Sequence, residues 1–399
     1  MSSGGFSKAR LARMHDILAG HVAAGALPGL VTLIDRKGET HVDAIGTTAM
    51  GGGSPMQRDT IFRIASMTKP IVAVAAMILV EECRLRLHEP VDALLPELAD
   101  RKVLKRLDGP LDDTVPAKRP ITLRDLLTFR AGCGLVMAPS GTSPIQAAME
   151  EAGLTPGPTA GDMAPDEWMQ KLGALPLQHQ PGEGWRYHTG SEVLGVLIAR
   201  ATGQPLEAFL RERIFEPLGM RDTGFHVPPE KLHRLPEAYG RNKDGGGLKL
   251  YEGVANTRFA KPPAFPSGGG GLVSTADDYL AFLRMMLGKG RLGDVRILSR
   301  PAVELMTIDH ITPEQKAGQE MFFANGAGWG FGVGVSNRRE TLAGTPGRFG
   351  WDGGFGTSGY ADPTEDMVGL LLTQRIMDSP APPPTFVDFW TSAYAAIDD

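Results

Sequence analysis

The spacing of apolar residues predicts that the chain opens with a helix and a hairpin. Within residues 8–24, apolar side chains recur every three to four positions, which is the period of an amphipathic helix. These positions are Leu11, Met14, Ile17, Leu18 and Val22. A Pro-Gly pair at 28–29 ends this helix. Two short apolar runs, 30–35 and 40–45, follow on either side of Arg-Lys-Gly-Glu, a pattern typical of a β-hairpin.

Residues 66–82 (SMTKPIVAVAAMILVEE) form the most apolar helix candidate of the chain. Apolar side chains occupy nearly every face of this segment, so we expect it to be buried at the centre of the protein. Pro70 lacks the N–H that an interior helical turn needs, and the helix must therefore begin within the few residues before it. This constraint places Ser66 at the N-terminus of a buried helix.

The middle of the chain is rich in helical patterns, and strand patterns return near its C-terminus. The predicted helices are 123–129, 165–172, 191–202 and 205–218, with Gly203 and Gly219 at positions where helices commonly end. The predicted strands are 328–336, 357–361 and 366–374, and a closing helix is predicted at 386–397. Residues 132–164, rich in Gly, Pro, Ser and Ala, are either a loop beside a site or a surface insertion.

These elements predict an α/β (α+β) fold. Strands come from both ends of the chain and helices from its middle. The simplest architecture is an antiparallel sheet flanked by helices, built from residues 1–80 and 265–399. A mainly helical domain of residues 81–264 would be inserted, with the active site between the two.

Composition and charge exclude several classes of function. The 41 Lys and Arg residues nearly balance 46 Asp and Glu residues, giving a formal charge of −5, so nucleic acid is not an expected partner. The first residues lack the pattern of a signal peptide, and no apolar run is long enough to cross a bilayer. We therefore expect a cytoplasmic protein that does not associate with membranes.

The chain also lacks the usual motifs for metals and cofactors. Its nine histidines are scattered, without the spacing of a metal site, and no P-loop or dinucleotide motif is present. Cys83 and Cys133 are too few and too far apart for a disulfide framework, and we expect both to be buried free thiols. No serine lies in a G-x-S-x-G elbow, which argues against an α/β-hydrolase. We expect neither a metal nor a cofactor.

The tetrapeptide Ser66-Met67-Thr68-Lys69 carries the first candidate chemistry. Residues three apart share one face of a helix, so the Lys69 amine can reach the Ser66 hydroxyl. An apolar environment lowers the pKa of a lysine, and a neutral amine can take the proton of a serine nucleophile. Two structural alternatives remain: Ser66 could be only a helix cap, and Lys69 could extend to the surface near the helix end.

Two further segments could complete such a site. Tyr187 lies in a Gly-rich loop before the predicted helix 191–202, where a phenol beside an ammonium group would have a lowered pKa and could relay protons. Residues 350–357 (GWDGGFGT) precede a predicted strand, and a backbone N–H there could join that of Ser66 in an oxyanion hole. Alternatively, Tyr187 is a packed aromatic residue and 350–357 an ordinary turn.

Taken in this order, the three motifs resemble those of the serine β-lactamase and penicillin-binding-protein superfamily. Within it the chain is most similar to the class C-like branch and to the family VIII carboxylesterases. The similar segments cover most of the chain. They are IFRIASMTKP around position 66, ITLRDLLTFRAG at 121–132, the stretch 181–225, GGGGLVSTADDYLAFLRMML at 268–287 and GWDGGFGTSGYADP at 350–363.

The resemblance implies a role for each matching residue. Ser66 would be the acylated nucleophile, Lys69 its base or proton partner, and Tyr187 the second acid/base. Trp351, Asp352 and Gly353 would occupy the third, substrate-binding motif. The backbone N–H groups of Ser66 and Gly354 would form the oxyanion hole.

Two departures from the family pattern bear on the substrate. Thr189 replaces an asparagine that lactamases and transpeptidases usually have, and Trp351 replaces their usual Lys or His. A cation at that position would pair with a substrate carboxylate, whereas Trp351 offers an apolar face and one N–H. Asp352 would discourage carboxylates further if its side chain faced the site. These differences favour neutral esters over β-lactams and peptidoglycan termini.

The motifs and the resemblance together favour a serine carboxylesterase that acts on small esters through an acyl-enzyme on Ser66. Short-chain esters are the substrates that the resemblance implies, since the sequence itself does not set the chain length. Its oligomeric state is open. Three alternatives remain: a β-lactamase or D-alanyl-D-alanine carboxypeptidase, an acyltransferase on the same fold, and a catalytically silent binding module.

Overall fold

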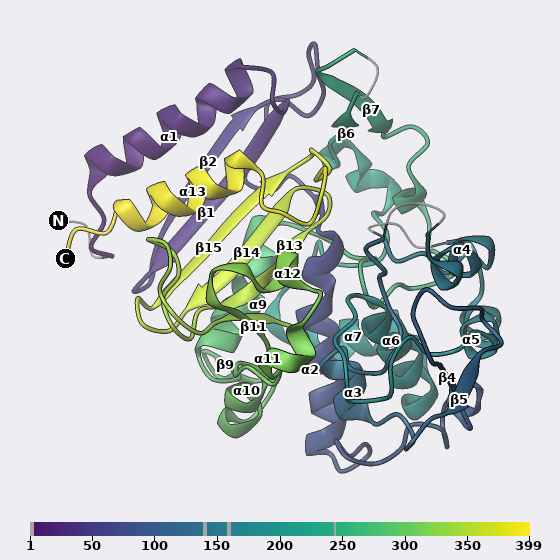
Figure 1. Ribbon diagram of the computed structural model, residues 1–399. Helices are drawn as coiled ribbons and strands as arrows, with labels where there is room; N and C mark the ends of the chain where they lie inside the picture. Colours follow the sequence, from purple (N-terminus) through teal and green to yellow (C-terminus); the bar gives the residue numbers. More distant parts are fainter. Residues whose placement is uncertain (1–3, 139–141, 158–160, 243–244) are drawn as a thin grey trace.

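A seven-stranded antiparallel sheet is the centre of the computed structural model, which describes residues 4–138, 142–157, 161–242 and 245–399. The strand order is β11-β12-β13-β14-β15-β1-β2 (Figure 1). The strands are β1 (Gly29–Arg36), β2 (Glu39–Gly46), β11 (Ala327–Trp329), β12 (Gly334–Ser336), β13 (Phe349–Gly353), β14 (Thr357–Asp362) and β15 (Met367–Thr373). Strand β1 pairs with both β2 and β15, which joins the N-terminal hairpin to the C-terminal strands. The predicted fold class is confirmed, while the domain boundaries at 80 and 265 stay predictions.

Helices cover both faces of this sheet. Helices α1 (Lys8–Ala23) and α13 (Pro384–Ala395) lie side by side over one face, with the two chain ends adjacent (Figure 1). The Ser7 N–H donates to the Ala396 carbonyl oxygen at 2.9 Å, which ties the ends together. Helix α9 (Ala276–Leu287) packs against β14, β15 and β1. The helices predicted at 8–24 and 386–397 are thus confirmed within two residues.

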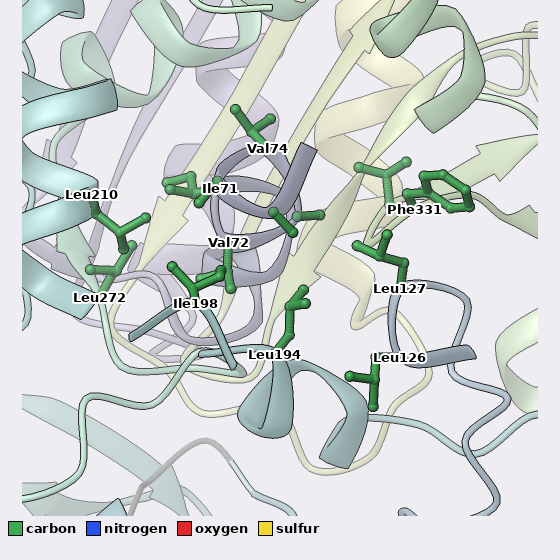
Figure 2. Packing of buried hydrophobic residues seen from close by; sticks show 14 of the residues in the cluster. Ile71, Val72, Val74, Leu126, Leu127, Leu194, Ile198, Leu210, Leu272 and Phe331 are labelled. Atoms are coloured by element: carbon green, nitrogen blue, oxygen red, sulfur yellow. The ribbon is translucent and has the colours of Figure 1, made fainter. Parts of the chain in front are cut away.

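Helix α2 (Thr68–Glu81) runs through the core beside the sheet. Its first 12 residues are buried, as the apolar sequence predicts. Figure 2 shows Ile71, Val72 and Val74 of α2 surrounded by apolar side chains from several other elements. Among these are Leu126, Leu127, Leu194, Ile198, Leu210, Leu272 and Phe331. Each fully buried aliphatic side chain contributes about 1.5–3 kcal/mol to stability, so this packing holds the helix and the residues at its N-terminus in place.

The remaining elements lie mostly in the middle of the chain. The helices are α3 (Leu123–Leu127), α4 (Pro144–Glu151), α5 (Pro165–Ala174), α6 (Thr189–Thr202), α7 (Leu206–Leu210), α8 (Glu216–Leu218), α10 (Arg300–Met306), α11 (Pro313–Lys316) and α12 (Glu320–Phe323). The short strand pairs are β3 (Phe62–Arg63) with β8 (Val273–Ser274), β4 (Lys102–Leu104) with β5 (Thr114–Pro116), β6 (Ala238–Arg241) with β7 (Leu248–Glu252), and β9 (Arg291–Leu292) with β10 (Val295–Arg296).

Several local predictions are wrong in detail. The stretch 328–336 is a hairpin of β11 and β12, because the chain turns between them and the Gly330 N–H donates to the Val333 carbonyl. The helix predicted at 205–218 is interrupted by a π-helical segment, Arg211–Phe215. The stretch 350–357 leads into β14, as predicted, but its first four residues also belong to strand β13, which the sequence did not predict. The stretch 132–164 contains α4, although its residues 139–141 and 158–160 lie outside the described part of the chain.

The two cysteines are free, as predicted, but only one is buried. Cys133 is buried, which raises the pKa of its thiol to about 11. Cys83 is exposed because it follows the end of α2, where the chain emerges from the core.

In the described residues, no single helix has the length and hydropathy of a membrane-spanning segment. Helix α6 and the helical segment 206–218 have that length and hydropathy only when taken together, and the pair is bent by 82°.

Candidate active site

Ser66 lies in a single 3-10 turn, Ala65–Met67, that leads directly into α2. The sequence placed it at a helix N-terminus, and this is confirmed. Ala65 before it is buried and has φ of +41°, a left-handed conformation that is unfavourable for a residue with a side chain. Contacts from elsewhere hold the turn: Ile64 N–H donates to the Leu272 carbonyl (3.0 Å), and the Tyr279 hydroxyl to the Met67 carbonyl (2.9 Å). Such strain is typical of functional sites.

Lys69 lies fully buried one turn behind Ser66. Its Nζ is 2.9 Å from Ser66 Oγ, 2.6 Å from the Gly269 carbonyl oxygen and 3.2 Å from His188 Nδ1. Burial lowers the pKa of Lys69 to about 7, opposed by the negative charge of Glu192. The amine therefore does not extend to the surface, which was the structural alternative. Because its pKa is about 7, a large fraction of the amine is neutral near pH 7.

Tyr187 adjoins both residues from the loop that precedes α6. Its hydroxyl oxygen accepts a hydrogen bond from Trp351 Nε1 (2.6 Å) and also hydrogen-bonds with Ser66. Lys69 Nζ lies over the face of the Tyr187 ring, 4.6 Å from its centroid. The pKa of Tyr187, which was expected to be lowered, is instead raised, because burial outweighs the effect of its hydrogen bonds with Ser66 and Trp351. Tyr187 is therefore a neutral phenol near pH 7.

An aromatic cluster fixes the Tyr187 ring, as the packing alternative anticipated. The rings around it, with centroids 4.8–6.3 Å away, are Phe129, Trp185, Phe322, Trp329 and Trp351. Tyr187 is thus both a packed aromatic residue and a neighbour of Ser66. The cluster restricts the ring so that its hydroxyl stays at the serine.

Strand β13 supplies the third motif. Trp351 and Asp352 point to opposite faces of the strand, since side chains alternate along it. The Trp351 N–H is engaged by Tyr187, so it is not the free donor that the sequence suggested. Asp352 is held by the Ser358 hydroxyl, which donates to Oδ1 at 2.5 Å. A Cβ on Gly353 would lie 2.3 Å from the Ile64 carbonyl oxygen, so only glycine allows β13 to approach the serine turn this closely.

The backbone N–H groups of Ser66 and Gly354 each follow a carbonyl that is used in a turn hydrogen bond. The Ala65 carbonyl accepts from Thr68 N–H, and the Gly353 carbonyl accepts from Gly356 N–H. The N–H of a trans peptide is directed opposite to its carbonyl. The N–H groups of Ser66 and Gly354 are therefore directed away from the hydrogen bonds that the two carbonyls accept. Both residues line the same cavity.

That cavity has a volume of about 550 Å³ and is mostly apolar. Ser66, Tyr187 and Trp351 line one part of it, and it extends to Phe386 and Trp390 on α13. The sequence analysis missed Arg348, another lining residue, whose guanidinium lies between the rings of Tyr360 (3.8 Å) and Trp390 (4.1 Å). Among the residues described, no group of three or more His, Cys, Asp or Glu side chains could hold a metal ion.

Sequence reasoning also missed a buried polar group behind Lys69. His188 Nε2 lies 2.9 Å from Glu192 Oε1, and the same carboxylate accepts from Ser267 Oγ (2.6 Å) and the Gly269 N–H (3.1 Å). His188 and Glu192 are 4% and 6% exposed. The sequence carried no clear signal for this pair, because His188 lies before the predicted helix 191–202 and adopts a non-helical backbone with φ of +83°.

Comparisons with known proteins bear on the family of the chain. A family model described as "Beta-lactamase" matches residues 14–381. Protein Rv1367c of Mycobacterium tuberculosis is 40% identical over 363 residues, covering 89% of this chain and 88% of the relative. Esterase EstB of Burkholderia gladioli is 33% identical over 375 residues, covering 90% and 89%.

Solved structures share the fold. The structure titled "EstCE1, a hydrolase with promiscuous acyltransferase activity" has a TM-score of 0.80 at 24% identity, covering 96% of this chain and 98% of its own. A mutant of simvastatin synthase (LovD) from Aspergillus terreus has a TM-score of 0.77 at 26% identity, covering 97% and 95%.

Proposed function

Because the chain belongs to the beta-lactamase family, within the serine β-lactamase and penicillin-binding-protein superfamily, we propose that it is a serine carboxylesterase with an acyl-enzyme on Ser66. One observation carries the proposal. The Ser66 hydroxyl lies 2.9 Å from a fully buried amine whose pKa is lowered to about 7. A neutral amine at that distance can accept the serine proton as Oγ attacks an ester carbonyl.

In the first step, Ser66 Oγ bonds to the carbonyl carbon and its proton moves to Lys69. The negative charge on the carbonyl oxygen would be stabilised by the N–H groups of Ser66 and Gly354. Tyr187 is protonated and hydrogen-bonded to Ser66, so it is suited to pass a proton to the departing alcohol, and Lys69 restores it. In the second step, water takes the place of the alcohol, and the same groups act in reverse.

This assignment makes Lys69 the resting base and Tyr187 the resting acid. The two would still titrate as a coupled pair, since each changes the charge beside the other. The sequence left this choice open. It is favoured here by the opposite directions of the two pKa shifts.

The proposed substrates are small, uncharged carboxylic esters, with a short acyl chain, in a cytoplasmic setting. Trp351 supplies no cation at the third motif, and its N–H is already engaged by Tyr187. Asp352 lines the cavity from the opposite face of β13, and burial raises the pKa of its carboxyl, so it supplies no cation for a substrate carboxylate either. EstB carries the name of an esterase, which agrees with this choice over a β-lactamase or carboxypeptidase.

Comparing a p-nitrophenyl ester with a chromogenic cephalosporin tests the proposal. We expect ester turnover that is lost in Ser66→Ala and kept in Ser54→Ala, which alters an exposed loop serine. Intact mass after treatment with a fluorophosphonate should show one adduct in wild type and none in Ser66→Ala. Strong cephalosporin turnover with negligible ester turnover would refute the ester assignment. The absence of any labelling would favour a silent binding module.

Acyl transfer to an alcohol is a second candidate, because EstCE1 and simvastatin synthase share this fold over nearly the whole chain. A cavity of about 550 Å³ leaves room for an acceptor beside a small acyl group. Adding a series of alcohols during ester turnover tests this. New esters at the expense of free acid would support transfer, and unchanged acid release would count against it.

A further inference from the structure

His188 and Glu192 form a buried pair that the mechanism above does not use. His188 has φ of +83° and ψ of −63°, and the Thr189 N–H donates back to the Tyr187 carbonyl at 3.2 Å. This is a three-residue γ-turn of the strained kind, at a residue with a bulky side chain. The strained turn directs the imidazole between Lys69 and Glu192.

Glu192 fixes the position of the imidazole proton. The carboxylate accepts from Ser267 Oγ, from the Gly269 N–H and from His188 Nε2, and these contacts keep its pKa low despite burial. A carboxylate only accepts hydrogen bonds, so the His188 proton lies on Nε2. Nδ1 is then left as a bare acceptor that faces Lys69. Burial and the neighbouring Lys69 lower the pKa of His188, which keeps the ring neutral.

The acceptors around Lys69 determine where its lone pair points. A neutral amine has two N–H donors and one lone pair. The Gly269 carbonyl oxygen at 2.6 Å and His188 Nδ1 at 3.2 Å can only accept, so each takes one N–H. The third neighbour, Ser66 Oγ at 2.9 Å, can donate its own hydrogen.

We propose that His188, oriented by Glu192, is a positioning residue that turns the lone pair of Lys69 toward the Ser66 hydroxyl. The proposal rests on the ester hydrolysis proposed above. When Ser66 attacks, its O–H bond breaks and a third N–H bond forms on Lys69. The ammonium keeps its bonds to Gly269 and His188, and its new N–H faces the reacting oxygen. His188 gains and loses no proton.

Glycine at position 269 belongs to this arrangement. A Cβ there would lie 2.7 Å from Glu192 Oε1 and 2.9 Å from His188 Nε2. A side chain would therefore separate the carboxylate from the imidazole. With glycine, one residue gives its N–H to Glu192 and its carbonyl to Lys69.

Two substitutions of His188 separate its two ring nitrogens. In His188→Gln the amide nitrogen can take the place of Nε2 and keep the bond to Glu192, but nothing replaces Nδ1. In His188→Asn the amide oxygen can take the place of Nδ1 beside Lys69, and asparagine tolerates a positive φ. We expect His188→Gln to lower kcat by about 10–100-fold, because a misplaced catalytic group has effects of that order, with KM little changed. His188→Asn should retain at least about tenfold more kcat than His188→Gln.

Glu192→Gln supplies a test that does not depend on either histidine variant. The amide can donate to Nε2, which moves the imidazole proton to Nδ1 and turns the Lys69 lone pair away from Ser66. The variant also removes the charge that raises the pKa of Lys69. Besides Glu192, the groups that face Lys69 are His188, Ser66 and the Tyr187 ring. We expect a lower kcat together with an acidic limb of kcat/KM displaced to lower pH.

His21→Gln is the matched control, because His21 Nε2 also meets a carboxylate, Asp388 Oδ2 at 2.7 Å, but on α1 and outside the cavity. Its kcat and pH profile should equal those of wild type. Equal kcat in the two His188 variants, or an unmoved acidic limb in Glu192→Gln, would overturn the positioning role. Fluorophosphonate labelling of Ser66 in wild type distinguishes this failure from failure of the proposed function, in which no label would appear.

Discussion

A Lys69→Met variant should change how the stability of the protein depends on pH. Lys69 has a pKa of about 7 in the folded protein, against an ordinary value of 10.5. Between these values the unfolded chain binds more protons than the folded one, so the wild-type free energy of unfolding rises with pH. Methionine has a similar length and does not titrate, so the variant lacks this contribution.

The size of the effect follows from the shift. A difference of about 3.5 pH units between 10.5 and 7 corresponds to about 5 kcal/mol at about 1.4 kcal/mol per unit. The penalty of the buried charge is complete below pH 7 and is removed as the pH approaches 10.5. Relative to Lys69→Met, wild type should therefore gain about 1.4 kcal/mol for each pH unit between roughly 7.5 and 9.5.

Urea denaturation of both proteins at several pH values in this range measures the difference. Other titrating groups are common to the two proteins and cancel. The unpaired Gly269 carbonyl and His188 Nδ1 in the variant shift its curve by a nearly constant amount, without changing its slope. Parallel curves for wild type and variant would refute the reasoning, because they would mean that Lys69 keeps its ordinary pKa when buried.

Four further predictions concern the groups around Ser66. Tyr187→Phe should lower kcat by about 10²–10⁴-fold in steady-state assays, and near-normal kcat would remove the tyrosine from proton transfer. Trp351→Phe removes the N–H that holds the Tyr187 hydroxyl, together with one ring of the indole, and should lower kcat by about tenfold, less than Tyr187→Phe; a larger loss would contradict this order. The kcat/KM profile should rise through pH about 7 as Lys69 loses its proton, and a profile that is flat from pH 5 to 9 would exclude it as the base. Gly353→Ala should lower both activity and the free energy of unfolding, the latter by about 1–3 kcal/mol, because its Cβ would press on the Ile64 carbonyl; unchanged thermal unfolding would disprove the close contact.

Patterns that repeat along the chain predicted the framework well. The helix in 8–24, the hairpin of β1 and β2, and the buried helix behind Ser66 each show one clear period or one continuous apolar run, and the structure has all three. Pro70 fixed where α2 could begin. The closeness of the Ser66 hydroxyl and the Lys69 amine then followed from their spacing of three residues along the helix.

The short strands and the polar surroundings of Lys69 could not be read in this way. Strand β13 holds two glycines among five residues, which weakens any strand signal, and it is stabilised by β14 and β12 instead. Gly269 reaches Lys69 from 200 positions away through the fold. The raised pKa of Tyr187 depends on how completely other elements bury it, and local sequence carries no information on that.

Transfer of an acyl group to Ser66 is the central step of the proposed reaction, and one measurement tests it directly. A rapid-quench experiment with a p-nitrophenyl ester, followed by peptide mapping, should show one acyl group on the peptide that contains Ser66. The acylated fraction should form in a burst in wild type and be absent from Lys69→Met. An acyl group on any other residue, or ester turnover with no acylated peptide, would contradict the account.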